Sequence, residues 1–137
     1  MEWHREEFTI SDDPQRVNPE IVAGLLAKTY WGPKRSPQVV EKLIPNSFCF
    51  SLRRNGEQIG FARVVTDFTV FSWLSDLVID DGYRGKGLGR WFLECILNHP
   101  RIGKTQFVLQ TTTAHGLYEK YGFRGSEKIM TRLPGNR

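Results

Sequence analysis

The chain has 137 residues, 39% of them hydrophobic, and carries 19 lysines and arginines against 15 aspartates and glutamates. This length predicts a single domain, residues 1–137, which can bury about two thirds of its unfolded surface in one core. No apolar run reaches the roughly 18 residues of a membrane span, and the N-terminus has neither a basic leader nor a cleavage site. We therefore expect a cytoplasmic protein with no membrane partner.

The first 46 residues predict one strand and two helices. Residues 3–10 form the strand. Asn18, followed by Pro19, is typical of a helix N-cap, and an apolar stripe continues to residues 30–33, where Gly32 and Pro33 end it. A shorter helix begins at Ser36 and Pro37 and ends at residues 45–46.

From Ser47 the hydrophobic period changes from helical to strand-like. A strand over residues 48–52 leads into Asn55-Gly56, which is a strong signal for a hairpin turn, and residues 58–66 are predicted to form the return strand. After a break at 66–69, a third strand runs over residues 70–79.

The last part of the chain alternates between helix and strand. We expect a helix over residues 88–98, a short buried strand over 107–110, a helix capped by residues 111–113 and ended by Gly122, and one or two strands over 123–133. This order predicts an α/β (α+β) fold, with a mixed, mostly antiparallel central sheet of six to seven strands flanked by about four helices.

A glycine-rich turn lies between the third of these strands and the helix that follows. Gly85, Gly87 and Gly89 let the backbone adopt positive φ and turn its N–H groups toward a close ligand, and the helix adds its positive N-terminal end. Arg84, Lys86 and Arg90 add positive charge, although such a turn could also be a solvated basic loop. The combination indicates a phosphate-binding site.

Two common phosphate loops do not fit this turn. A dinucleotide fingerprint would need glycine where Arg90 stands, and a Walker loop would need lysine where Leu88 stands. The remaining R-x-x-G-x-G pattern resembles the pyrophosphate loop of the GNAT superfamily of acyl-CoA-dependent N-acyltransferases. Residues 114–123, Ala-His-Gly-Leu-Tyr-Glu-Lys-Tyr-Gly-Phe, are similar to that family's A-x-x-L-Y-x-x-x-G-F segment. The resemblance covers about residues 47–133.

The resemblance implies a GNAT-like fold and an N-acetyltransferase that moves an acetyl group from acetyl-CoA to a primary amine by direct attack in a ternary complex. The acceptor is a small-molecule or protein amine, and its specificity is expected to lie in residues 3–46 and 66–70. We expect a monomer or homodimer. The net charge of +4 suits a polyanionic cofactor as well as a nucleic acid, but the basic residues follow no single helix, so no nucleic-acid partner is expected.

The resemblance also implies the cofactor-binding residues. In the family the strand before the loop splays from its neighbour, and its free backbone groups bind pantetheine and polarise the thioester carbonyl. Leu77, Val78 and Ile79 match these positions, although periodicity alone fits a plain buried strand. The predicted cofactor-binding set is Leu77, Val78, Ile79, Arg84, Gly85, Lys86, Gly87, Leu88, Gly89 and Arg90.

The resemblance implies one general acid and leaves the base open. Tyr118 matches the family's proton donor, but Tyr121 has the same chemistry and lies near the same helical face. Asp76 is the candidate general base, with Asp67 as an alternative. The competing hypothesis is a non-catalytic acyl-CoA-binding regulatory module.

The cysteines and histidines show no metal-ligand spacing, so we expect no metal. Cys49 and Cys95 lie in apolar segments and are predicted to be buried.

Overall fold

The computed structural model describes residues 1–29 and 34–135, and its centre is one six-stranded sheet with neighbours in the order β1-β2-β3-β4-β5-β6. All neighbouring strands are antiparallel except β5 and β6, which are parallel. The strands are β1 (Glu2–Arg5), β2 (Phe8–Ser11), β3 (Phe48–Arg54), β4 (Glu57–Thr66), β5 (Phe71–Ile79) and β6 (Gln106–Val108).

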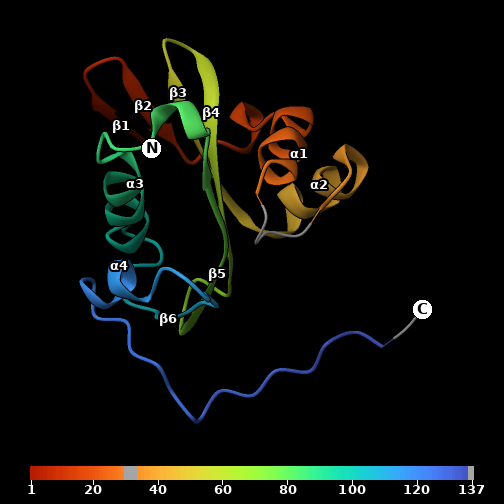
Figure 1. Cartoon of the computed structure of the whole chain (residues 1–137), viewed down its shortest axis with the longest axis vertical. Helices are drawn as coiled ribbons and strands as arrows, with labels where there is room; N and C mark the ends of the chain where they lie inside the picture. The colour runs from red at the N-terminus through yellow and green to blue at the C-terminus, as the bar shows by residue number, and fades with distance from the viewer. Residues whose placement is uncertain (30–33, 136–137) are drawn as a thin grey trace.

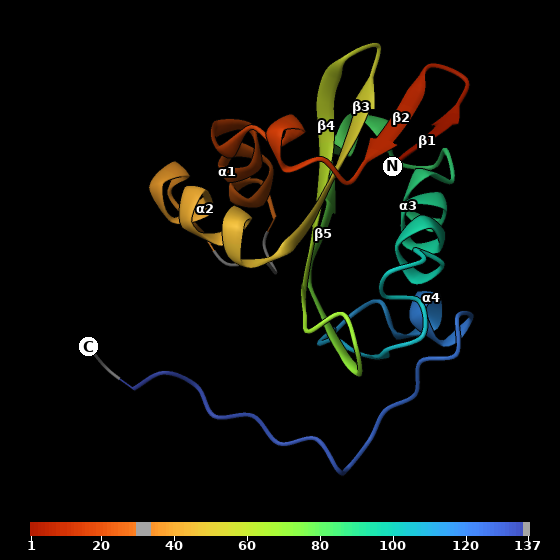
Figure 2. The ribbon, with the colours of Figure 1, turned by 180° about the vertical axis from the view of Figure 1, so that it is seen from behind.

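Helices cover both faces of the sheet. α1 (Pro19–Ala27) and α2 (Pro37–Leu43) lie on one side, and α3 (Leu88–Leu97) and α4 (His115–Glu119) lie on the other (Figures 1 and 2). The predicted fold class, a mixed and mostly antiparallel sheet flanked by four helices, is confirmed. The prediction that the first helix continues to residues 30–33 is wrong, because α1 ends at Ala27. The predicted stop residues Gly32 and Pro33 lie outside the described residues.

Local sequence signals place most of these elements. The Asn18 side chain accepts a hydrogen bond from the Glu20 amide at 2.9 Å, and Ser36 accepts one from Val39 at 3.3 Å, so both predicted N-caps are confirmed. Asn55 and Gly56 both have positive φ, 49° and 87°, in the turn between β3 and β4. The predicted hairpin is therefore present, with the backbone twist that short hairpin turns favour.

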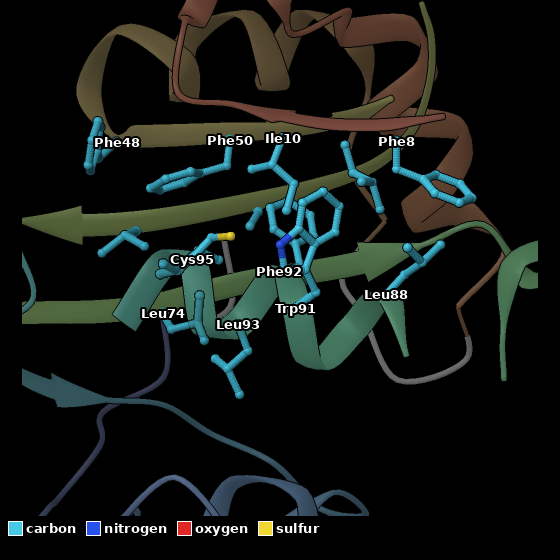
Figure 3. Packing of buried hydrophobic residues seen from close by; sticks show 14 of the residues in the cluster. Phe8, Ile10, Phe48, Phe50, Leu74, Leu88, Trp91, Phe92, Leu93 and Cys95 are labelled. Atoms are coloured by element: carbon cyan, nitrogen blue, oxygen red, sulfur yellow. The ribbon is translucent and has the colours of Figure 1, made fainter. Parts of the chain in front are cut away.

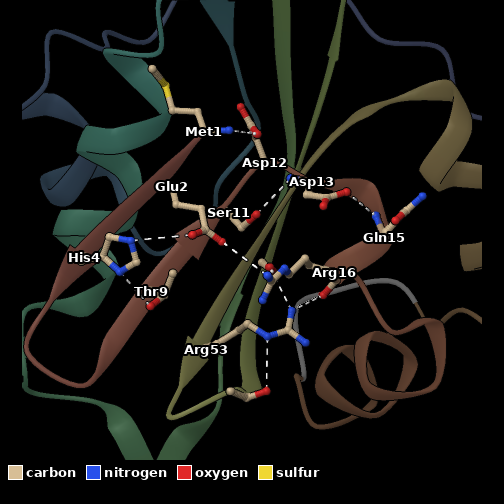
Figure 4. Close-up of polar contacts among 12 residues, drawn as sticks. Met1, Glu2, His4, Thr9, Ser11, Asp12, Asp13, Gln15, Arg16 and Arg53 are labelled. Carbon is tan, nitrogen blue, oxygen red and sulfur yellow. Dashed lines mark hydrogen bonds and ion pairs between the residues drawn. The ribbon is translucent and has the colours of Figure 1, made fainter.

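The prediction of one strand over residues 3–10 is wrong, because the chain turns back at Glu6 and Glu7 to form the β1–β2 hairpin. Glu6 has φ 54°, a conformation that few residues other than glycine adopt. Because positions 6 and 7 are both glutamate, the sequence gives no signal for this turn. Polar contacts hold the hairpin's ends (Figure 4). The Met1 ammonium lies 2.8 Å from the Asp12 carboxylate and so joins the two ends. Asp13 accepts from the Gln15 amide at 2.9 Å and caps the 3-10 helix that follows, Pro14–Arg16.

The predicted C-terminal strand is also wrong, because the described residues beyond Phe123 form no regular element. Figure 1 shows this segment running away from the sheet. Met130 and Leu133 are 93% and 80% exposed, so these apolar side chains make no buried contact that would hold a strand against the sheet.

The apolar core has two layers, one on each face of the sheet. Phe50 and Leu52 of β3 pack with Phe92 and Ile96 of α3 on one face (Figure 3). On the other face α1 and α2 pack against the sheet, through the cluster Val17, Val22, Leu25, Leu26, Val40, Cys49, Phe61 and Val78. Successive side chains of β3 therefore point into opposite layers, and both sets are buried because the strand is covered on both sides.

Both cysteines belong to these layers, as predicted. Burial raises the pKa of the Cys49 thiol to about 12 and that of Cys95 to about 11, so neither is a thiolate at neutral pH.

The pairing of β5 with β4 contains one irregularity. Arg63 of β4 pairs with Asp76 and Val64 pairs with Leu74, which leaves Ser75 as an extra residue, a β-bulge. Leu74 packs into the α3 layer, whereas Val78 packs into the α1–α2 layer. The bulge therefore reverses which face each later residue of β5 points toward.

Candidate active site

A cleft of about 780 Å³ opens beside β5, where this strand loses its neighbour. β6 pairs only with Phe71, Ser72 and Trp73, and from residue 74 to 79 the described residues provide no strand on that side of β5. Leu77, Val78 and Ile79 line the cleft. An extended ligand can use an open strand edge as an added strand, and these are the three positions that the sequence predicted.

The opposite wall of the cleft is formed by residues 110–114 and by α4, which begins directly after them. The predicted cap by residues 111–113 is only partly right. Thr111 accepts a hydrogen bond from the Ala114 amide at 3.0 Å, but Ala114 itself holds the N-cap position, and α4 has only five residues.

The glycine-rich turn forms the end of the cleft nearest α3. Gly85 and Gly87 have φ values of 81° and 75°, and Gly87 is the N-cap of α3. Two of the three predicted glycines therefore have positive φ, whereas Gly89 lies in the first turn of α3. The amides from Gly85 to Arg90 donate to no group within the described part of the chain. Six successive free donors at the positive end of a helix are suited to an anion, and Gly89 lines the cleft directly.

The charged side chains of the turn are less closely grouped than the sequence suggested. Arg84 lines the cleft and lies 2.8 Å from Asp81. Lys86 instead lines a separate cavity of about 500 Å³ beside the β1–β2 hairpin, together with Arg5 and Arg54. Arg90 is exposed and lines neither cavity. Of the turn residues predicted to bind the cofactor, the structure therefore brings Arg84 and Gly89 to the cleft. Leu88 lines the other cavity with Lys86, and Gly85 and Gly87, like Arg90, line neither.

The structure separates the two tyrosines that spacing could not distinguish. Tyr118 lines the cleft and is partly buried, with its ring 5.6 Å from that of Phe123, and burial raises the pKa of its phenol. Tyr121 lies outside the cleft, where its hydroxyl donates to Glu94 at 2.8 Å. Of the two, only Tyr118 can meet a ligand in the cleft.

Asp76 lies behind the cleft wall in a buried ion cluster. Its two carboxylate oxygens accept from Arg63 Nε at 2.7 Å and from Arg35 at 2.8 Å, and its side chain is only 1% exposed. Arg63 also donates to Ser47 and Ser75. Both carboxylate oxygens are occupied by guanidinium donors and Asp76 does not line the cleft, so this geometry favours a positioning role for Asp76 over the predicted role as base.

Asp67, the alternative base, lies in the β4–β5 turn and does not line the cleft. Its carboxylate accepts from the amides of Thr69, Val70 and Phe71, so it forms part of the turn.

No group of three or more His, Cys, Asp or Glu side chains within residues 1–29 and 34–135 is placed to hold a metal ion. Among the same residues, no helix has both the length and the apolar character that a membrane crossing requires.

Comparison with known families identifies this arrangement. Residues 45–125 match the family described as acetyltransferase (GNAT) domain. This stretch holds β3 to β6, the glycine-rich turn and Tyr118, and it covers more than half of the chain. The chain belongs to the GNAT acetyltransferase family. It is therefore an acyltransferase.

Individual relatives agree with this assignment. The chain is 28% identical to a provisionally named acetyltransferase of Gibberella zeae, over 97% of this chain and 93% of that protein. A crystal structure of a provisionally assigned GNAT acetyltransferase from Xanthomonas campestris pv. campestris is 29% identical, covers 93% of each chain and has a TM-score of 0.85.

A more distant neighbour shares the fold alone. The GNAT acetyltransferase from Elizabethkingia anophelis, solved with acetyl-CoA bound, is 17% identical, with a TM-score of 0.67 over 90% of this chain and 80% of that one.

Two residues that line or support this GNAT cleft gave no signal in the sequence. Arg35 lines the cleft from the loop before α2, and Arg63 lies behind it in β4. Their common partner Asp76 is 41 and 13 residues away, so no local motif connects the three. The register of β4 against β5 would have revealed the Arg63–Asp76 pair, but only with the bulge at Ser75 included.

Proposed function

We propose that this GNAT protein is an N-acetyltransferase that moves an acetyl group from acetyl-CoA to a primary amine by direct attack in a ternary complex. The observation that carries the proposal is the single cleft that joins the open edge of β5, the glycine-rich turn and Tyr118. Acetyl-CoA supplies an activated acetyl thioester at the end of a long polyanionic carrier.

The backbone provides most of the binding. The amides of Gly85 to Arg90 face the pyrophosphate, because they are unpaired donors at a helix N-terminus and the glycines allow close approach. The edge of β5 at Leu77 to Ile79 pairs with the amide groups of the pantetheine arm, as an added strand would, and one of its N–H groups polarises the acetyl carbonyl.

Tyr118 acts as the general acid. The amine nitrogen bonds to the acetyl carbon as the carbon–sulfur bond breaks, and the Tyr118 hydroxyl gives its proton to the sulfur. The acetylated nitrogen loses a proton to water, and the phenolate regains one from water. Because burial raises the phenol pKa, Tyr118 is fully protonated at neutral pH and ready to donate.

Direct attack is favoured over a covalent acyl-enzyme because neither cysteine can act as the carrier. The chain has two cysteines, both are buried in the core, and neither lines the cleft.

The test is a panel of primary amines with acetyl-CoA, followed by detection of the released CoA with a thiol reagent. Tyr118→Phe keeps the ring and its packing but removes the proton, so we expect kcat to fall about a hundredfold or more with acetyl-CoA affinity unchanged. Tyr121→Phe is the matched control, because its hydroxyl lies outside the cleft, and it should change kcat little. Equal and small losses in the two variants would contradict the role of Tyr118.

A second outcome would support the alternative function. A folded protein that binds acetyl-CoA and releases no CoA with any amine is a regulatory acyl-CoA-binding module. The cytoplasmic location and the monomeric or homodimeric state stay predictions.

A further inference from the structure

We propose that the acceptor amine carries a carboxylate close to its reacting nitrogen, and that Arg35 binds this carboxylate. The inference rests on the proposed acetyl transfer and names the class of its acceptor.

Three of the described residues that line the cleft are cations, and two of them pair with carboxylates that no other described cation shares. Lys28 lies 3.5 Å from Asp80, and Arg84 lies 2.8 Å from Asp81. These pairs are close to neutral, so they provide little net attraction for an anionic acceptor.

Arg35 differs because its carboxylate is shared. Asp76 neutralises one positive charge, but it is paired with both Arg35 and Arg63, so two guanidinium groups and one carboxylate leave a net charge of +1. Arg63 is buried and bonded through all three of its nitrogens, whereas Arg35 keeps 20% of its side chain exposed and lines the cleft. The unbalanced charge is therefore available to the cleft at Arg35.

The guanidinium of Arg35 also has unused donors. One nitrogen donates to Asp76, and the described residues offer no acceptor to the remaining N–H groups. A planar group fixed at one end, with a free pair of parallel donors, suits a carboxylate, which can accept both hydrogen bonds at once. A monoanionic carboxylate also cancels the net charge of +1, whereas a phosphate dianion would exceed it.

The position of Arg35 matches the acceptor side of the proposed reaction. Because the bulge at Ser75 turns Asp76 toward the α1–α2 layer, Arg35 approaches from that layer, while Tyr118 belongs to α4 on the opposite face of the sheet. Asp76 directly precedes Leu77, the first residue of the predicted thioester-polarising edge. An amine whose carboxylate lies on Arg35 therefore enters beside that edge.

The experiment compares each common L-amino acid with its own carboxamide as acceptor, using released CoA as the readout. The carboxamide has the less basic amine, so it holds more free amine at neutral pH and should be the better acceptor if charge recognition is absent. We expect the opposite, with kcat/KM at least tenfold higher for at least one acid than for its amide. Equal or higher activity with every amide would overturn the proposal.

Two variants locate the recognition. Arg35→Gln leaves the Asp76–Arg63 pair neutral and intact, so the protein should fold, and KM for the acid should rise roughly 10- to 100-fold, the value of a charged hydrogen bond, with kcat, KM for acetyl-CoA and amide activity unchanged. Lys28→Gln removes another cleft cation and is the control. Equal losses for acid and amide in Arg35→Gln would mean that Arg35 only holds the loop.

A binding measurement separates this inference from the proposed function. If no amine releases CoA, the N-acetyltransferase proposal fails, but the melting temperature still reports on Arg35. At least one of the L-amino acids should stabilise the wild-type protein and not Arg35→Gln, and its carboxamide should stabilise neither. Stabilisation of both proteins by the acids would overturn the assignment of Arg35.

Discussion

The anion-binding role of the glycine-rich turn can be tested at Gly87. A substitution there affects the stability of the fold and the binding of phosphate by different amounts, so the two effects can be measured separately. With φ at 75° the residue is in the left-handed region, and a Cβ built on it would meet nothing within 4 Å. Gly87→Ala therefore meets no steric clash in the free protein. The substitution should reduce the free energy of unfolding by about 1–2 kcal/mol through backbone strain. In a domain of this size each kcal/mol lowers Tm by about 3–6 °C.

The effect on the ligand is a different quantity. A Cβ in this open space lies where a phosphate must approach the amides, so binding should weaken beyond the loss in stability. Acetyl-CoA at about 100 times its Kd should add about 2.7 kcal/mol to wild-type stability, and a hundredfold loss in affinity would reduce this to about 0.4 kcal/mol. Differential scanning fluorimetry with and without acetyl-CoA measures both numbers.

Gly56 provides a matched control. It also has positive φ, 87°, and open space around its Cβ, but it lies in the β3–β4 hairpin turn and lines neither cavity. Gly56→Ala should lower Tm by a similar amount and keep the full acetyl-CoA shift. A Gly87→Ala protein with the wild-type shift would refute phosphate binding at this turn.

Three further predictions follow from the charged groups. Asp76→Asn should reduce the free energy of unfolding by about 3 kcal/mol, because it leaves two arginines facing an uncharged partner, whereas a role as base alone would leave denaturant stability unchanged. Arg84→Ala should weaken CoA binding by about fivefold or less and reduce its salt dependence, while Lys86→Ala, in the other cavity, should not, as titration at two salt concentrations would show. The Phe71 amide, with those of Thr69 and Val70, holds the pKa of Asp67 below its ordinary value of 3.8, so Asp67 stabilises the fold above that pH and the benefit is lost as pH falls through the lower folded pKa. Asp67→Ala should therefore lower Tm at pH 7, with the difference from wild type disappearing in acid; a difference that persists at pH 2 would contradict this reasoning.

The sequence predicted the features that local chemistry specifies. Asn18 and Ser36 cap their helices, Asn55-Gly56 turns a hairpin, and the glycine-rich turn places positive φ at the start of α3. Each signal lies within a few residues of the structure that it specifies, so each can be read without a fold.

The errors arise where structure depends on distant partners. The β1–β2 turn at Glu6 has no turn residue, and the pattern around Met130 and Leu133 predicts a strand that has no partner within the described residues. Arg35 could not be found for the same reason, because its importance lies in an ion cluster formed across the fold. Helical spacing could not distinguish Tyr118 from Tyr121; the family resemblance favoured Tyr118, and the cleft separates the two.

The bulge makes β5 unequally sensitive to changes in length. Loss of Ser75 would restore regular pairing and leave Asp76 opposite Arg63, still facing the α1–α2 layer. Deletion of one residue between Asp76 and Ile79 would instead turn the residues after it to the opposite face of the sheet, and the edge beside the cleft would present the wrong side chains. We infer that relatives able to bind ligands in the same way must preserve the number of residues between Asp76 and the glycine-rich turn more strictly than the presence of the bulge residue itself.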